Sequence, residues 1–279
     1  MEVSTSSFYN FVNGVTYQTS LNRQVLLKEV KQIFYFHKRR YGARRIWEEL
    51  KDKGYKIGLH RVKGLMKEQQ LIAIQPKRFV PRTTQSHPNL RRSPNLLLDM
   101  PFPDAPDQVI VGDITYLPTP DQSEDGWLYL AVWMDLYSRK IVGWIVADNM
   151  EEIIVTDALK QVIKNRQPPH GMIVHSDGGS QYGANNFRAL LGHHKFRQSM
   201  TRKNDHYDNA FIESLFSRFK AELLDGGVFE DLVDAKIKTF EYIEAYYNTI
   251  RKHSSIGYLS PQQYEDRYWI AYWKKNKPS

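Results

Sequence analysis

Proline is concentrated in one stretch of this chain, and that stretch limits how the chain can fold. Seven of the 13 prolines in the 279 residues lie between positions 76 and 106. Proline lacks a backbone N–H and disfavours helix in the residue before it, so a helix or a central strand is not expected to cross this stretch. We therefore expect a linker over residues 75–107, between a first domain at 1–74 and a second at 108–265 with a tail at 266–279.

The two parts differ in charge. Residues 1–100 hold 19 Lys and Arg against 7 Asp and Glu, a net of +12, whereas the rest of the chain is at −4. A basic module joined to a mildly acidic one indicates that the first binds nucleic acid. The absence of cysteine excludes disulfides, cysteine-ligated zinc and a cysteine nucleophile. No apolar run approaches the ~20 residues of a membrane span and no signal peptide is evident, so we expect a soluble, cytoplasmic protein.

Helical periodicity marks the basic part. Apolar residues recur at helical spacing over residues 26–34, 43–50 and 59–70, and the short connection before the third segment is typical of a helix-turn-helix. The third segment leaves Arg61 and Lys63 off its apolar stripe, where they can reach phosphates or base edges of double-stranded DNA. A merely solvated polar face is the other interpretation, and the net charge favours DNA.

The pattern changes to β after the linker. Three runs rich in β-branched and aromatic residues, at 109–117, 127–136 and 140–147, predict an antiparallel meander. Helices and short strands then alternate, at 151–165, 172–175, 185–191, 196–200, 208–224 and 232–251. The predicted fold class is a mixed α/β sheet of five strands flanked by helices, preceded by an all-α domain.

Three acidic residues of the second part need an explanation. Asp113 interrupts an apolar strand, Asp177 follows a second strand, and Glu213 lies among apolar residues of a long helix. Each alone is also explained by backbone hydrogen bonds, a turn cap or a solvated face. Together they form an oxygen-rich set suited to two Mg²⁺ or Mn²⁺ ions, which support in-line phosphoryl displacement.

Six sequence blocks, in this order along the chain, resemble those of a known family. Asp177 lies in the fourth block and Glu213 in the fifth, and 35 residues separate them. The blocks are YGARRIWEELK (41–51), GDITYL (112–117), YLAVWMDLYSRKIVGW (129–144), HSDGGSQY (175–182), DNAFIESLFSRFKAEL (208–223) and YYNTIRKHSSIGYLSPQQYE (246–265). The chain resembles the DDE transposases and retroviral integrases, and most closely the OrfB-type transposases of the IS-three group of bacterial insertion sequences.

The resemblance implies an RNase H-like fold for the second domain and a catalytic, metal-binding triad of Asp113, Asp177 and Glu213. It also implies that water cleaves a phosphodiester at an element end and that the freed 3′-hydroxyl attacks another phosphodiester. No nucleotide cofactor is expected. We expect the protein to work as a homo-oligomer on two DNA ends, in the bacterial cytoplasm and associated with the nucleoid. Because no zipper heptads occur here, we expect an OrfA-type partner or fusion.

Other residues are candidates for DNA contacts. Lys220 lies two helical turns after Glu213 on the same face, and Asn209 lies one turn before it. A surface lysine and a helix N-cap are the alternative interpretations. The remaining candidates are the loop residues Arg202 and Lys203 and, in the first block, Arg44 and Arg45.

The sequence also departs from the pattern. Gly112 stands where the family usually has Thr, and the zinc-binding HHCC domain of retroviral integrases is absent. Two other hypotheses remain open: an inactive DNA-binding regulator derived from a transposase, and an RNase H-like nuclease that cuts without joining. The intact triad favours the transposase.

Overall fold

The computed structural model describes residues 4–76, 92–98, 100–121, 126–202 and 210–276. Two compact units divide the chain, Met1–Gln75 and Pro76–Ser279. Within the described ranges, no helix has both the length and the apolar character needed to cross a membrane.

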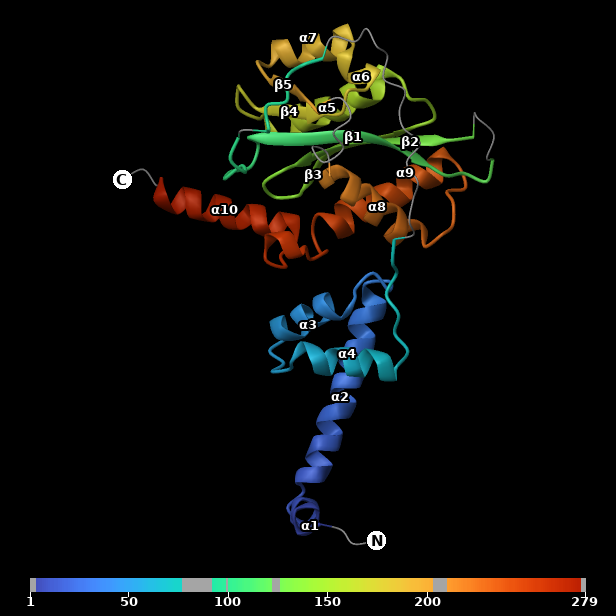
Figure 1. The fold of residues 1–279 in the computed structure, drawn as a ribbon, viewed down its shortest axis with the longest axis vertical. Coiled ribbons are helices and arrows are strands. Elements are labelled where there is room, and N and C mark those ends of the chain that lie inside the picture. The colour runs from blue at the N-terminus through green and yellow to red at the C-terminus, as the bar shows by residue number, and fades with distance from the viewer. Residues whose placement is uncertain (1–3, 77–91, 99, 122–125, 203–209, 277–279) are drawn as a thin grey trace. The chain divides into compact units, whose positions relative to one another are not determined.

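The first unit is helical (Figure 1). Its elements are α1 (Thr5–Val12), α2 (Val15–Phe36), α3 (Ala43–Asp52) and α4 (Leu59–Glu68). The last three correspond to the predicted helices, with α4 ending two residues before the predicted end at 70, whereas α1 had no signal in the sequence. Val30, Ile46 and Val62, one from each of α2 to α4, have no exposed surface and form the core between these helices. The indole N–H of Trp47 donates to the carbonyl of Ile57 at 2.6 Å, which fixes the turn between α3 and α4.

The second unit is built on a five-stranded sheet with the order β3-β2-β1-β4-β5. Its strands are β1 (Val109–Leu117), β2 (Leu128–Asp135), β3 (Ile141–Ala147), β4 (Ile173–Ser176) and β5 (Arg197–Met200). The first three strands pair antiparallel, as predicted, while β4 pairs parallel with both β1 and β5. This mixed sheet confirms the fold class expected from the sequence.

Helices cover both faces of the sheet (Figure 1). One face carries α5 (Glu152–Arg166), α6 (Ser180–Gly183) and α7 (Asn185–His193), and the other carries α8 (Ala210–Leu224) and α9 (Leu232–Phe240). Ile110 of β1 packs in the core that includes α5 and α7. Because side chains alternate along a strand, Val109, Val111 and Asp113 point to the opposite face, against which α8 packs.

Gly112 and Trp133 form a tight contact between β1 and β2. The two residues are register partners, and a Cβ on Gly112 would lie 2.3 Å from the Trp133 ring. The Trp133 ring is held in place, because its indole N–H donates to the carbonyl of Val155 at 3.1 Å. The position of this large buried ring therefore explains why Gly stands at position 112.

The single helix predicted over residues 232–251 is present as far as Tyr247, but its second half is not α-helical. After α9 the chain continues as a π-helix, η2 (Glu241–Tyr247). The wider π turn changes which residues face the core, so that Phe240 is 56% exposed while Tyr242 is 2% exposed. The Asn248 side chain then accepts from the N–H of Ile141 and donates to its carbonyl, both at 2.9 Å, which ties the end of η2 to β3.

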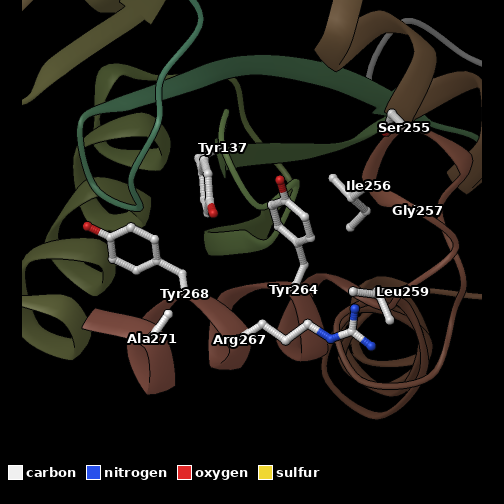
Figure 2. A pocket seen from close by; sticks show the side chains of 9 residues that line it. All are labelled: Tyr137, Ser255, Ile256, Gly257, Leu259, Tyr264, Arg267, Tyr268 and Ala271. Atoms are coloured by element: carbon white, nitrogen blue, oxygen red, sulfur yellow. The ribbon is translucent and has the colours of Figure 1, made fainter. Parts of the chain in front are cut away.

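A short 3-10 turn, η3 (Ser254–Ile256), leads into the last helix, α10 (Pro261–Lys275). The sequence placed the end of the second domain at residue 265, but α10 continues across this position. Tyr137, between β2 and β3, packs against Tyr264 and Tyr268 of α10, with ring centroids 5.0 and 5.5 Å apart. Together with Arg267, these rings line a hollow of about 470 Å³ (Figure 2).

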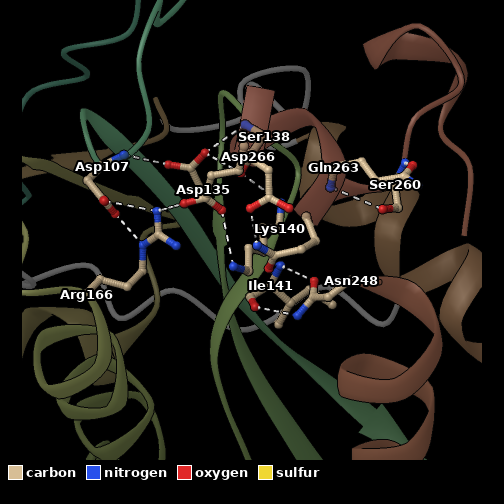
Figure 3. A network of polar contacts seen from close by, with 12 residues as sticks. Asp107, Asp135, Ser138, Lys140, Ile141, Arg166, Asn248, Ser260, Gln263 and Asp266 are labelled. Carbon is tan, nitrogen blue, oxygen red and sulfur yellow. Dashed lines mark hydrogen bonds and ion pairs between the residues drawn. The ribbon is translucent and has the colours of Figure 1, made fainter. Parts of the chain in front are cut away.

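A buried polar network also holds α10 (Figure 3). Arg166, at the end of α5, donates to the carboxylates of Asp107 and Glu265, and Lys140 lies 3.3 Å from Glu265. Burial opposes ionisation of Glu265, but the Arg166 guanidinium and Lys140 hold the pKa of this carboxyl below its usual range. The network therefore joins α5, the start of β1 and α10.

The last part of the predicted linker belongs to the second unit. The Ser93 hydroxyl donates to Oε1 of Gln198 at 2.8 Å, and the N–H of Met200 donates to the carbonyl of Pro94 at 3.4 Å. The segment therefore lies along β5, the edge strand of the sheet. Residues 77–91, in the middle of the predicted linker, lie outside the described residues.

Candidate active site

The strand register places Asp113 and Asp177 side by side. In the parallel pairing of β1 with β4, Gly112 is the partner of Ser176. Asp113 and Asp177 are the next residues in each case, and neighbouring strands lie about 4.8 Å apart. Two carboxylates separated by 63 residues of sequence are thus brought together where β4 ends beside β1.

Local hydrogen bonds orient both carboxylates. Oδ1 of Asp113 accepts from the N–H of Ile114 at 2.8 Å, and Oδ1 of Asp177 accepts from the N–H of Gly179 at 2.9 Å. Backbone bonding and turn capping, the structural explanations considered from the sequence, are therefore present. They do not account for two half-buried carboxylates lying next to each other, since like charges repel in a region of low dielectric.

The electrostatics of Asp113 show that the third acid is near. Burial and then the charge of Asp177 raise the pKa of Asp113 well above its usual value, and the charge of Glu213 adds to the rise. The Ile114 N–H and the Lys220 ammonium oppose it. The site thus collects negative charge that a bound cation would stabilise.

Glu213 and Lys220 both come from α8. Glu213 is exposed in the first turn of the helix, and Lys220 is half-buried two turns later. Burial lowers the pKa of Lys220 to about 8, against the opposing charge of Asp113. The structure therefore brings four of the predicted site residues, Asp113, Asp177, Glu213 and Lys220, into one electrostatic group.

Carboxylate oxygens are the ligands that Mg²⁺ and Mn²⁺ prefer, so the donor set fits these ions. Asp177 and Glu213 both raise the pKa of Asp113, which shows that three acidic groups act on one another at this place. Such a group of carboxylates agrees with binding of a divalent cation. In the described part of the chain, no three His, Asp or Glu side chains converge tightly enough to be assigned as a formed metal site.

A buried ion pair holds the other end of α8. Glu222 and Arg251 are 4% and 2% exposed, and the guanidinium donates to both carboxylate oxygens at 2.7 and 2.5 Å. The Tyr242 hydroxyl donates to the same carboxylate at 2.9 Å. Burial alone would lower the pKa of Arg251, but Glu222 raises it above its usual value. Sequence reasoning gave no role to this pair, because nothing local shows that the two residues meet.

The remaining candidates in the second unit are placed only in part. Arg202 is exposed just after β5. Lys203 and Asn209, which were predicted to contact DNA, lie outside the described residues. The hollow beside α10 is lined by none of the predicted site residues.

In the first unit, the basic candidates lie on α3 and α4. Arg61 and Lys63 are exposed on α4, and Arg44 is exposed on α3. Arg45 is half-buried, with its guanidinium carbon 5.5 Å from the centroid of the Tyr41 ring. Three of the four candidates therefore present their charge to solvent, as a DNA-binding surface requires.

Comparisons with known proteins agree with both units. A family model described as an integrase core domain matches residues 103–206, a second model with the same description matches 194–261, and an HTH-like domain model matches 21–79. The chain is 38% identical over 245 residues to the transposase for insertion sequence element IS904 of Lactococcus lactis, covering 88% of this chain and 95% of that protein.

Further similar proteins include two from enterobacterial insertion elements and one solved viral structure. Transposase InsF of insertion sequence IS3A from Escherichia coli is 39% identical over 82% of this chain and 78% of its own length. A 31 kDa protein of insertion element IS600 from Shigella sonnei is 36% identical over 95% of this chain and 96% of its own. The HTLV-2 integrase catalytic core, solved with magnesium, aligns at 16% identity and a TM-score of 0.44, covering 58% of this chain and 97% of that one.

An integrase core joined to an HTH-like domain defines a polynucleotidyl transferase of the DDE type. Identity to the curated transposases extends over most of this chain and most of theirs. The chain belongs to the IS3 group of bacterial insertion-sequence transposases, the group expected from the sequence.

Proposed function

We propose that Asp113, Asp177 and Glu213 are the catalytic triad of this transposase and hold two divalent metal ions. The observation that carries the proposal is the joint geometry of β1, β4 and α8. Register places the two aspartates together, and Glu213 acts electrostatically on Asp113 from the neighbouring helix. The chain works on double-stranded DNA in the bacterial cytoplasm, as a homo-oligomer on two element ends and with an OrfA-type partner or fusion.

The reaction exchanges phosphodiester bonds in two steps. In the first, a water oxygen bonds to phosphorus at the element end and the bond to the 3′-oxygen breaks, which leaves a 3′-hydroxyl. In the second, that oxygen attacks another phosphodiester and a second 3′-oxygen leaves. When bound, Mg²⁺ or Mn²⁺ activates the attacking oxygen and stabilises charge on the leaving oxygen. Each step breaks one P–O bond and forms another, so no nucleotide cofactor is needed.

The protein side chains supply binding and orientation. Asp113 and Asp177 are held by the backbone N–H groups of Ile114 and Gly179, which fixes one oxygen of each carboxylate. Lys220 places a cation beside Asp113, where it binds a phosphate next to the scissile bond. Arg202, Lys203 and Asn209 are further proposed contacts to the strand that is cut.

End cleavage tests this function directly. The full chain is incubated with labelled DNA that carries the cognate element ends, and the products are separated on a denaturing gel. With Mg²⁺ we expect a nick at the element end and then a joined product, and with excess EDTA we expect neither. Return of both products when Mg²⁺ or Mn²⁺ is added back would show that the metal, and not irreversible unfolding, is responsible.

The alternatives give different products. An inactive regulator would bind the ends without cutting them under any metal condition, and a nuclease would give the nick but never the joined strand. A wild-type chain that binds the ends and produces no nick with either metal would contradict the proposed activity.

We also propose that α3 and α4 of the first unit bind the element end through Arg44, Arg45, Arg61 and Lys63. Each phosphate contact releases counterions, so log affinity should fall with log salt at a slope of about −0.9 per contact. Replacing Arg61 with Ala should weaken binding and reduce the steepness of that slope by about 1 if this residue contacts a phosphate. Fluorescence anisotropy over a salt series measures both quantities.

Lys53 provides the matched control. Its ammonium lies 2.7 Å from Glu29 within the same unit, so its charge is already neutralised locally. Lys53→Ala should leave the salt slope unchanged. Equal slopes for Arg61→Ala and the wild type would assign Arg61 to the solvated surface.

A further inference from the structure

Arg92 is a charged residue at the candidate active site that neither the sequence blocks nor the comparisons assign. A Cβ on Gly178 would lie 2.6 Å from both Cζ and Nη2 of Arg92, so the guanidinium lies directly over the glycine that follows Asp177. Burial raises the pKa of Asp177, and the Gly179 N–H and the charge of Arg92 oppose that rise. Arg92 is thus close to Asp177 in both geometry and electrostatics.

The fold fixes this position. The residues that follow Arg92 are attached to the edge strand β5: the Ser93 hydroxyl donates to Oε1 of Gln198 at 2.8 Å, and the N–H of Leu96 donates to Oγ of Ser199 at 2.9 Å. These bonds join residues more than 100 positions apart in the sequence. The segment therefore carries the Arg92 guanidinium to the end of β4, where Asp177 lies.

A structural role does not account for the Arg92 side chain. It is exposed, and within the described residues it forms no ion pair with a carboxylate. The buried Arg166 and Arg251, by contrast, each donate to carboxylates at short distances. A guanidinium keeps its charge at any working pH and presents N–H donors in a fork that matches two phosphate oxygens.

We propose that Arg92 binds a backbone phosphate of the DNA strand that is cut or joined. This inference rests on the proposed function. Two cations then act on the two aspartates: the charge of Lys220 acts on Asp113, and Arg92, which lies over Gly178, acts on Asp177. Gly178 has no side chain, which leaves room for the Arg92 guanidinium over the backbone at this point. Arg92 lies within the predicted linker at 75–107. The linker that joins the DNA-binding unit to the second unit therefore also contributes a side chain to the active site.

The test compares full-length wild type, Arg92→Ala, Arg92→Lys and Arg197→Ala. Arg197 is the matched control, since it is exposed on β5 opposite Ile173 and so at the far end of the strand pair from Asp177. Each protein is assayed on element ends in which single phosphates around the scissile bond are replaced by neutral methylphosphonates. Binding of a pre-cleaved end is also measured without metal, and thermal unfolding checks that each variant is folded.

A charge-assisted hydrogen bond of this kind is worth about 10- to 100-fold. We expect Arg92→Ala to join strands about 10- to 100-fold more slowly than wild type and to bind the pre-cleaved end about 10- to 100-fold more weakly. Arg92→Lys should lose less in both measurements, and Arg197→Ala should match wild type. A methylphosphonate at the phosphate that Arg92 binds should reduce joining by wild type by the same factor. It should not reduce joining by Arg92→Ala any further, because the side chain and the phosphate charge contribute to one shared interaction.

Two results would overturn the inference and remain distinguishable from failure of the proposed function. If wild type cuts and joins while Arg92→Ala equals it, Arg92 does not bind the strand. If Arg92→Ala joins poorly but every methylphosphonate reduces its joining by the same factor as in wild type, then Arg92 acts through the fold and not by binding a phosphate. If wild type itself neither cuts nor joins, the proposed function fails, and this inference with it.

Discussion

Asp113→Asn should reduce end cleavage by more than about 100-fold while leaving binding of the element end by the first unit unchanged. Removing residues that only orient metal ligands typically costs 10- to 100-fold, so the loss of a ligand itself should cost more. Asn keeps the size of Asp and can still accept a hydrogen bond from the Ile114 N–H, so the variant isolates the effect of charge. Single-turnover cleavage with saturating Mg²⁺ measures the loss, and anisotropy with metal-free DNA measures binding.

The same substitution should stabilise the second unit. The wild-type carboxylate is held in a site where burial, Asp177 and Glu213 all disfavour its charge, and Asn removes that charge. A gain of about 1 kcal/mol would raise the thermal midpoint by 2–4 °C for a domain of this size. Asp157→Asn is the control, because the Asp157 side chain on α5 is 43% exposed and paired with Lys160. A variant that is inactive but also less stable than wild type would point to a structural role for Asp113.

Arg251→Ala should destabilise the second unit by about 3–5 kcal/mol, the usual cost of leaving one member of a buried ion pair without its partner. Glu222 would then be buried without the guanidinium that neutralises its charge, although the Tyr242 hydroxyl still donates to it. Because Glu222 belongs to α8, which also carries Glu213 and Lys220, cleavage should fall together with stability. Chemical denaturation and end cleavage on the same preparation measure the two effects.

The ion pair between Lys160 and Asp157 on α5 is the control, because these side chains are 55% and 43% exposed. Lys160→Ala should lower the free energy of unfolding by at most about 1 kcal/mol. A further variant separates charge from packing. Replacing Glu222 by Leu, Arg251 by Met and Tyr242 by Phe removes the buried ion pair together with the hydroxyl that donates to it, and should recover most of the stability. If Arg251→Ala is as stable as wild type, the pair does not hold α8.

The strands of the sheet were predictable because their signal is local. Over residues 109–117, 127–136 and 140–147, β-branched and aromatic side chains follow each other between turn residues, and the structure places β1 to β3 there to within one residue. The π-helix η2 was not predictable in this way, because its wider turn depends on contacts with β3 and α8 and not on helical periodicity.

The acids of the site were visible in the sequence because a charge in an apolar strand or helix is unexpected. The groups that position or supplement them were not, because their partners are far apart in the chain. Arg92 lies within the proline-rich stretch, and its place beside Asp177 depends on hydrogen bonds with β5. Arg251 meets Glu222 across 29 positions. Lys203 and Asn209 remain predictions.

The contact between Gly112 and Trp133 makes these two positions interdependent in evolution. With the indole fixed by Val155 and a Cβ at position 112 placed 2.3 Å from its ring, Gly112 cannot gain a side chain alone without displacing the Trp133 ring or the strand that carries Asp113. A lineage with Thr at this place would need a smaller or differently placed side chain on β2. Chimeras that exchange segments between insertion-sequence transposases should therefore transfer β1 and β2 as one unit, since splitting them would mismatch the two positions next to Asp113.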